Sequence, residues 1–151
     1  MPSRRHFLYG SAALTLVASG TPAFAAKSQF FTSWGVAIRG ADPVAYFTEN
    51  RAVEGSKKYQ STYKGAEFRF ASAENKALFD ADPDAYAPQY GGYCAWAVSH
   101  GYTASIVPEA FTIVDGKLYL NYSLSVRRQW EADQSNRIKL ADQNWPSVLE
   151  R

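Results

Sequence analysis

The stretch YQSTYKGAEFRFAS, residues 59–72, decides much of the fold, because polar and apolar side chains alternate on both sides of a Lys64-Gly65 pair. Alternation of this kind is typical of a β-strand with one buried face, and a glycine between two such runs favours a tight turn. We therefore expect a β-hairpin here. Ser72 follows the second strand and is well suited to cap the N-terminus of a helix over residues 73–80.

A second hairpin is indicated further along the chain. Residues 110–114 and 117–122 are rich in β-branched, aromatic and aliphatic side chains, and Asp115-Gly116 lies between them. An Asp-Gly pair between two such runs is among the strongest short-range signals of a hairpin. The two hairpins are separated by segments whose composition is helical rather than extended.

Short helices account for much of the remaining sequence. Asp82 and Pro83 suit the N-cap and the first position of a helix. Val126 and Trp130 lie four residues apart on the apolar side of an amphipathic helix, and a helical pattern continues through Ile138. The sequence therefore predicts an α+β fold, a single small domain of two β-hairpins packed with several short helices.

The start of the domain gives weaker signals. Residues 34–38 have the composition of a short strand, which Gly40 would end. Asp42-Pro43 favours a turn or a short helix. Residues 27–32 have no clear periodicity, so we expect them to form a loose arm.

The first 25 residues have the organisation of an export signal. Arg4 and Arg5 precede an uncharged stretch, and Ala23 and Ala25 provide small residues before a cleavage point. The run SRRHFL resembles the twin-arginine export motif. The uncharged stretch is shorter than the ~20 apolar residues that a membrane span needs.

We therefore expect residues 1–25 to be a cleaved twin-arginine signal peptide and residues 26–151 to form the domain. The location that follows is the periplasm, with no membrane anchor after cleavage. The whole chain has 16 Lys and Arg against 14 Asp and Glu, and Arg4 and Arg5 are the only charged residues before residue 26. The remaining charges balance, so a nucleic-acid partner is not expected.

Several motifs occur in the order and spacing of a known family. They are residues 40–47 (GADPVAYF), 63–65 (YKG), 68–72 (FRFAS), Phe79, Asp82-Pro83 and Tyr86. Together they resemble the YHS domain family, and YGGYCA at residues 90–95 is similar to a longer, exported branch of it. The resemblance implies a YHS-like fold for residues 26–151, with a role in binding a transition metal, copper or zinc.

The departures from the family pattern concern the metal ligands. Metal-handling YHS modules usually carry one cysteine after Asp-Pro-Val, a second in a Phe-Cys-Ser motif and a third shortly afterwards. Those positions are Ala45, Ala71 and Asn75 in this sequence. Tight zinc and cuprous sites need thiolate, imidazole or thioether ligands. The resemblance thus implies the family's fold without its usual metal site.

The segment YGGYCAWAVSHG, residues 90–101, holds the only cysteine, Cys94, and the only histidine after residue 6, His100. If residues 93–99 are helical, these two side chains lie about 120° apart around the helix axis. Three roles stay open for Cys94. It is a buried core residue, a copper or zinc ligand helped by His100 or a partner, or a redox-sensitive thiol near a helix N-terminus.

Aromatic side chains crowd the same segment. Tyr90, Tyr93, Trp96 and Tyr102 either line a pocket for a small ligand or belong to the core. A single histidine after residue 6 argues against a hydrolase triad, so no catalytic residues are expected.

The function we expect is that of a non-catalytic binding or accessory protein in the periplasm, with a metal ion or a periplasmic protein as partner. The alternatives are a structural or protein-interaction module without metal and a thiol redox sensor that uses Cys94. The sequence does not indicate an oligomeric state.

Overall fold

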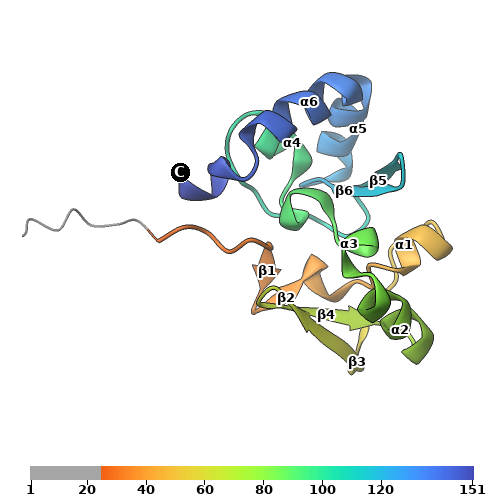
Figure 1. The fold of residues 1–151 in the computed structure, drawn as a ribbon. Coiled ribbons are helices and arrows are strands. Elements are labelled where there is room, and N and C mark those ends of the chain that lie inside the picture. The colour runs from red at the N-terminus through yellow and green to blue at the C-terminus, as the bar shows by residue number, and fades with distance from the viewer. Residues whose placement is uncertain (1–24) are drawn as a thin grey trace, which may run out of the picture.

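A mixed four-stranded sheet forms one side of the molecule (Figure 1). The structure is a computed structural model that describes residues 25–151. The strand order is β1-β2-β4-β3, in which β2 and β4 run parallel and the other neighbours antiparallel. The strands are β1 (Thr32–Ser33), β2 (Val36–Ala37), β3 (Ser56–Tyr63) and β4 (Ala66–Phe70).

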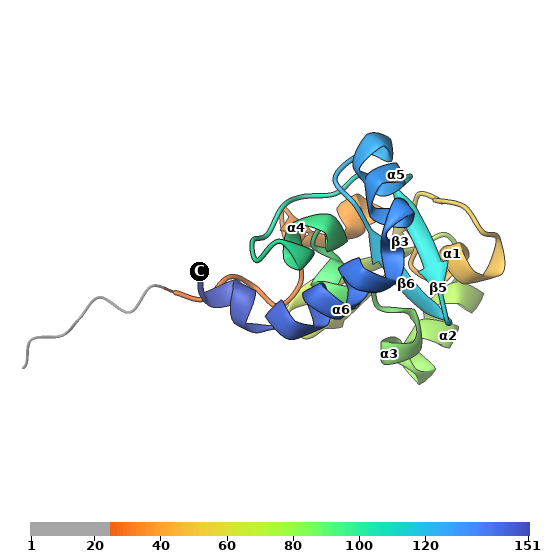
Figure 2. The same ribbon diagram turned by 90° about the horizontal axis from the view of Figure 1, so that it is seen from above.

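A separate two-stranded antiparallel sheet and three helices, α4 to α6, form the other side (Figures 1 and 2). Its strands are β5 (Phe111–Val114) and β6 (Lys117–Leu120). The α-helices within the described residues are α1 (Ala45–Thr48), α2 (Ala73–Ala81), α3 (Pro83–Tyr86), α4 (Ala95–Ser99), α5 (Leu124–Ala132) and α6 (Gln134–Asn144). Short 3-10 helices lie at Ile38–Gly40, Gln89–Gly92 and Ser147–Glu150. The predicted α+β class is confirmed.

Both predicted hairpins are present. Lys64 and Gly65 have φ of 47° and 81°, and Asp115 and Gly116 have φ of 51° and 72°. Two central residues with positive φ make type I′ turns, whose twist matches that of the flanking strands. Ser72 caps α2 as expected, because its hydroxyl accepts a hydrogen bond from the backbone N–H of Asn75.

The expected strand over residues 34–38 is confirmed only in part, because β2 covers Val36–Ala37 alone. The chain reverses at Trp34-Gly35, so that β1 and β2 form a small hairpin of their own. Asp82 also differs from expectation: Pro83 begins α3, but the Asp82 side chain makes no capping hydrogen bond. Periodicity could not detect a reversal between strands of two residues each.

The expected loose arm over residues 27–32 is wrong as well, because this segment is hydrogen-bonded along its length. Lys27 N–H donates to Leu149 O at 2.8 Å, and Phe31 N–H donates to Gly91 O at 2.9 Å. The Tyr93 hydroxyl donates to Ser28 O at 2.8 Å. Figures 1 and 2 show the C-terminal segment beside this arm. The partners are more than 50 residues away in sequence, so local pattern could not show them.

The apolar side chains form two neighbouring clusters. One lies under the four-stranded sheet and is built mainly of aromatic rings, among them Phe30, Tyr46, Phe68, Phe70 and Phe79. The other joins α4, α5, α6 and β6, and contains Tyr90, Tyr93, Tyr119, Trp130 and Val148. Residues 1–24, with Arg4, Arg5 and nearly all of the expected signal peptide, lie outside the described residues.

One fully buried carboxylate, that of Asp42, connects three elements of the first cluster. Its Oδ1 accepts hydrogen bonds from the backbone N–H groups of Val44 and Ala45 at 2.8 and 3.3 Å. Its Oδ2 accepts from Ala71 N–H and from Asn75 Nδ2, both at 2.8 Å. Asp42 thus joins the start of α1 to the end of β4 and to the first turn of α2.

Replacing this carboxylate with an amide should destabilise the fold. In Asp42→Asn one acceptor oxygen becomes an NH2 group that faces N–H donors, and we expect a loss of about 2–4 kcal/mol in the free energy of unfolding. Urea unfolding measures it, as a lower midpoint with an unchanged slope. The control Asp80→Asn removes an exposed partner of Lys76 and should change stability by less than about 0.5 kcal/mol. Equal effects of the two changes would contradict the role of Asp42.

Gly91 should be required for residues 27–31 to pack against the 3-10 helix at Gln89–Gly92. A Cβ atom built on Gly91 would lie 1.8 Å from Gln29 O, whereas one on Gly116 would meet nothing within 4 Å. Both glycines have positive φ, so an alanine strains the backbone at either position. We expect Gly91→Ala to lower the melting temperature clearly more than Gly116→Ala, and to open residues 27–31 to amide hydrogen exchange. Similar exchange in both variants would contradict this.

Candidate functional site

A pocket of about 280 Å³ lies beside Cys94, between the start of α4, the segment that follows it and the start of α5. Its wall is mostly apolar or aromatic. The lining residues are Cys94, Trp96, Ala97, Tyr102, Ala104, Tyr122 and Val126. We refer to it as the Cys94 pocket. A concave, largely apolar surface with one polar group is the usual form of a small-molecule site.

The backbone and the sulfur of Cys94 are both fixed. Cys94 is the N-cap residue of α4, and its N–H donates to Ala104 O at 3.0 Å. The backbone N–H of Tyr122 donates to Sγ, with 3.3 Å between the nitrogen and the sulfur. The thiol S–H donates to Asn121 Oδ1 at 3.6 Å. Both functions of a neutral thiol, donor and acceptor, are therefore satisfied.

The environment of Cys94 favours that neutral form. Only 1% of the residue is exposed, and burial raises the pKa of the Cys94 thiol above its ordinary value. Hydrogen bonding from backbone N–H groups of Ala97, Tyr122 and Trp96 acts in the opposite direction, but burial is the larger cause. A thiol held in this way is a weak nucleophile at neutral pH.

Asn121 is the second polar residue of this region, and sequence reasoning missed its role. It is fully buried at the end of β6, and its Oδ1 accepts a hydrogen bond from Trp96 N–H at 3.0 Å. Since Cys94 makes no side-chain cap, Asn121 supplies the acceptor for the N-terminus of α4. Its Nδ2 has no protein partner within residues 25–151. Asn121 lies inside the predicted strand over residues 117–122, whereas β6 ends at Leu120, so no sequence pattern signalled its role.

His100 and Arg137 support the outer wall of the Cys94 pocket. The Arg137 guanidinium lies 4.3 Å from the Trp96 ring centroid, and the His100 ring lies 4.5 Å from the same ring. Arg137 Nη1 donates to His100 Nε2 at 3.2 Å. Because arginine offers only donors, Nε2 must be the acceptor, and Nδ1–H then donates to Trp96 O at 2.8 Å. Both ring nitrogens of His100 are therefore engaged.

Two of the four aromatic residues predicted to line a pocket do line the Cys94 pocket, and the other two belong to the core. Trp96 and Tyr102 line the Cys94 pocket, and Tyr122 joins them. Tyr90 and Tyr93 do not; they pack in the second core cluster. The Tyr90 hydroxyl donates to Asp142 Oδ1 at 2.8 Å, and burial raises the pKa of Tyr90, with the Asp142 carboxylate adding to the rise. Burial alone raises the pKa of Tyr93.

The side chains present do not form a complete copper or zinc site. Within residues 25–151, no group of three or more His, Cys, Asp and Glu side chains lies close enough together to hold a metal ion. The polar neighbours of Cys94 Sγ are one amide oxygen and one backbone N–H. The donor set of the described chain therefore does not fit a tight site for either metal.

The three positions where the resemblance places cysteine ligands do lie together. Ala45 N–H, Ala71 N–H and the Asn75 side chain all donate to the carboxylate of Asp42. Where the family pattern has thiols around one point, this chain has a buried carboxylate with hydrogen-bond donors around it.

The comparison with protein families gave a match to part of the chain. Residues 44–90 match the family model of the YHS domain. YHS domains are often linked to metal binding. The comparisons found no similar protein among curated proteins and none among solved structures.

The YHS match runs from the residue before α1 to the start of the 3-10 helix at Gln89–Gly92. The Cys94 pocket therefore lies wholly outside it, in the segment that follows. Among the described helices, none combines the length and the apolar character that a membrane span requires.

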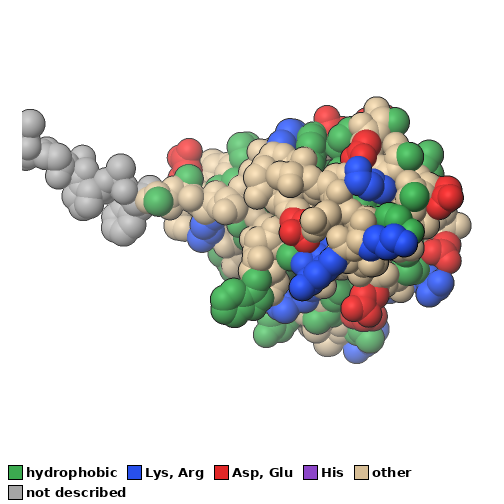
Figure 3. All heavy atoms as spheres, turned by 90° about the horizontal axis from the view of Figure 1, so that it is seen from below, with side chains coloured by type: hydrophobic (Ala, Val, Ile, Leu, Met, Phe, Trp, Pro, Cys, Tyr) green, Lys and Arg blue, Asp and Glu red, His purple; other side chains and the backbone are tan. Residues whose placement is uncertain are grey.

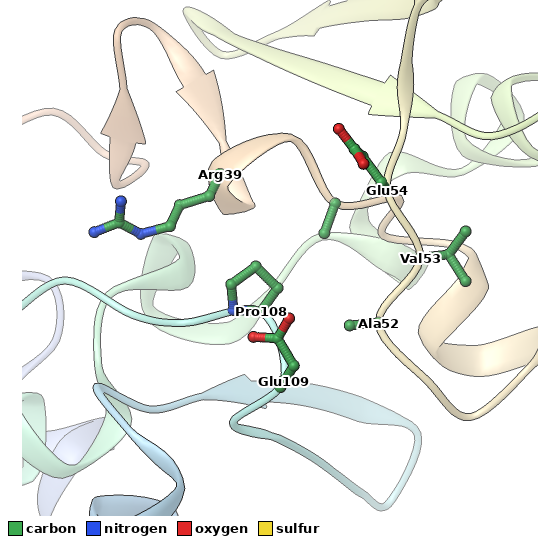
Figure 4. Close-up of a pocket in the computed structure, with 7 residues that line it drawn as sticks. Arg39, Ala52, Val53, Glu54, Pro108 and Glu109 are labelled. Carbon is green, nitrogen blue, oxygen red and sulfur yellow. The ribbon is translucent and has the colours of Figure 1, made fainter.

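A second hollow, of about 230 Å³, lies between the segments at residues 39–41, 52–54 and 108–109 (Figure 4). Arg39, Glu54 and Glu109 line it together with small and apolar residues. Figure 4 shows the Arg39 guanidinium pointing away from both carboxylates, and its Nε donates to Ile106 O at 2.7 Å. Because the charged groups do not converge, this hollow is a weaker candidate than the Cys94 pocket.

The pH dependence of Cys94 alkylation tests the state of the thiol. Because burial raises its pKa, we expect the rate with N-ethylmaleimide to keep increasing as the pH passes the ordinary thiol value of about 8.5. The same reaction in urea should level off near that value. The thiol pKa is higher in the folded than in the unfolded protein, so the free energy of unfolding should fall as the pH rises from the unfolded to the folded value. Cys94→Ala should lack this part of the fall. A midpoint below about 8 in the folded protein would contradict a neutral, buried thiol.

Proposed function

We propose that this chain is a non-catalytic binding protein that holds a small, largely apolar molecule in the Cys94 pocket. The observation that carries the proposal is the pocket itself, a hollow walled by Trp96, Tyr102 and Val126 with a neutral thiol at its surface. Export to the periplasm by the twin-arginine route is part of the proposal and rests on Arg4 and Arg5.

A thiol redox sensor is the second candidate. The backbone N–H of Tyr122 points at Sγ and would stabilise a thiolate or an oxidised sulfur. Against it, Cys94 is only 1% exposed, and burial raises the pKa of its thiol. A sensor needs an accessible thiolate, so the buried thiol favours ligand binding.

A copper or zinc role remains the function that the YHS resemblance implies. Cys94 would be its thiolate ligand, but both ring nitrogens of His100 already have protein partners. The remaining donors would have to come from a second molecule. The metal role is therefore the alternative that the experiment must separate from ligand binding.

Protection of Cys94 by a small aromatic probe tests ligand binding. We expect indole at millimolar concentration to slow alkylation of Cys94 several-fold, because it would occupy the space that the reagent must enter. Val126→Phe should fill the pocket and abolish this protection, since Val126 lines it. The matched control is Leu124→Phe, on the same helix but half exposed and outside the pocket. Absence of protection in the wild type, or equal protection in Val126→Phe, would contradict the proposal.

Metal analysis of the wild-type protein and of Cys94→Ser, both isolated from the host, distinguishes a metal site from ligand binding. Under ligand binding the copper and zinc contents of the two proteins are equal. Metal that is present in the wild type and lost in Cys94→Ser would overturn ligand binding in favour of a metal site.

A further inference from the structure

The most exposed large side chain in the described part of the molecule is that of Trp34, whose relative exposure is 101%. It lies with Gly35 in the two-residue turn between β1 and β2. A Cβ atom on Gly35 would meet nothing within 4 Å, so the turn itself projects into open space. The other exposed large apolar residues, such as Tyr102 and Leu124, are about half covered.

The backbone at Trp34 makes its presence more unusual. Trp34 and Gly35 have φ of 54° and 82°, the pattern of a type I′ turn. Asn and Gly are the residues that favour such turns, whereas a bulky side chain at positive φ is strained. Neither folding nor packing of the described chain requires an indole at this position. A strained residue that the fold does not need indicates a function.

Cationic side chains surround the base of the turn. A broad, shallow hollow next to Trp34 is lined by Arg39, Lys57 and Arg69, together with Ser33 and Val36. Arg69 pairs with Glu67 at 2.7 Å. Within residues 25–151, Arg39 and Lys57 have no carboxylate partner in an ion pair, so the positive charge there is only partly balanced. Figure 3 views the molecule from the side of the four-stranded sheet and shows Lys and Arg side chains next to projecting hydrophobic ones.

We propose that this turn is a peripheral docking point for an anionic phospholipid surface. The Trp34 indole enters the headgroup region, and Lys57, Arg39 and Arg69 contact lipid phosphates. Tryptophan prefers the membrane–water interface because its ring is apolar and its N–H is polar. Basic residues next to it add attraction to an anionic leaflet, which salt screens. This surface is separate from the Cys94 pocket, and the proposal stands or falls independently of ligand binding there.

A bilayer fits these features better than a protein partner does. The surface is a projecting tip with a shallow basic hollow beside it, and it has no enclosed cleft that would select one partner side chain. Residues 26–151 carry equal numbers of basic and acidic side chains, so the local positive charge is not part of a generally basic surface. The positive charge beside Trp34 therefore comes from the local arrangement of Arg39, Lys57 and Arg69.

Vesicle co-sedimentation tests the proposal. The protein is isolated from its host, its N-terminus is determined by mass spectrometry, and it is mixed with vesicles of phosphatidylcholine alone or with one-third phosphatidylglycerol. We expect binding to the anionic vesicles only, weakened by salt. Trp34→Asn should reduce it at least tenfold. Asparagine suits the turn, so this variant should unfold at the same temperature as the wild type or higher, which separates binding from folding.

A matched pair of charge reversals tests the basic residues. Lys57→Glu should weaken binding several-fold, whereas Lys139→Glu, an identical change on α6, should leave it within twofold. Equal binding to neutral vesicles, or unchanged binding of Trp34→Asn, would overturn the proposal. An absence of vesicle binding would also overturn the proposal. The same holds if sedimentation velocity shows that Trp34 mediates association of two copies of the chain instead.

Discussion

The buried carboxylate of Asp42 is the constraint on which the four-stranded sheet and the helices beside it depend. A buried charge is tolerated only when hydrogen bonds replace the water it has lost, and Asp42 receives four from three separate elements. These elements must therefore form together. The donors are the backbone N–H groups of Val44, Ala45 and Ala71 and the side chain of Asn75. The last three are the positions where the resemblance places cysteines, so hydrogen bonds to one carboxylate join the segments that carry those positions.

The sequence predicted the parts of the fold that local chemistry determines. The turns at Lys64-Gly65 and Asp115-Gly116 each need positive φ at two adjacent residues, and the flanking alternation sets the strands. The β1–β2 hairpin was missed because a turn with tryptophan lacks that signal. The arm over residues 27–31 was missed because its partners, Gly91 and Leu149, are distant in sequence.

The residues of the candidate site between positions 94 and 102 could be predicted from the sequence, and those that follow the second hairpin could not. Cys94, Trp96 and Tyr102 are close in sequence and could be identified from composition alone. Tyr122 and Val126 reach the same pocket from beyond the second hairpin, and Asn121 Oδ1 accepts a hydrogen bond from Cys94 Sγ. Their contribution follows from the return of the chain after β6, which places the Tyr122 N–H against Cys94 Sγ. Neither hydrophobic periodicity nor a sequence motif predicts a contact between groups this far apart in the chain.

The position of the Cys94 pocket relative to the YHS match limits what the family resemblance can explain. The matched residues, 44–90, include β3, β4 and the four donors to the Asp42 carboxylate, while every residue that lines the Cys94 pocket follows them. The wall of the pocket is held by contacts within that later segment, since Arg137 and His100 both pack on Trp96. The ligand binding proposed for this chain therefore depends on the later segment, which the YHS match does not cover.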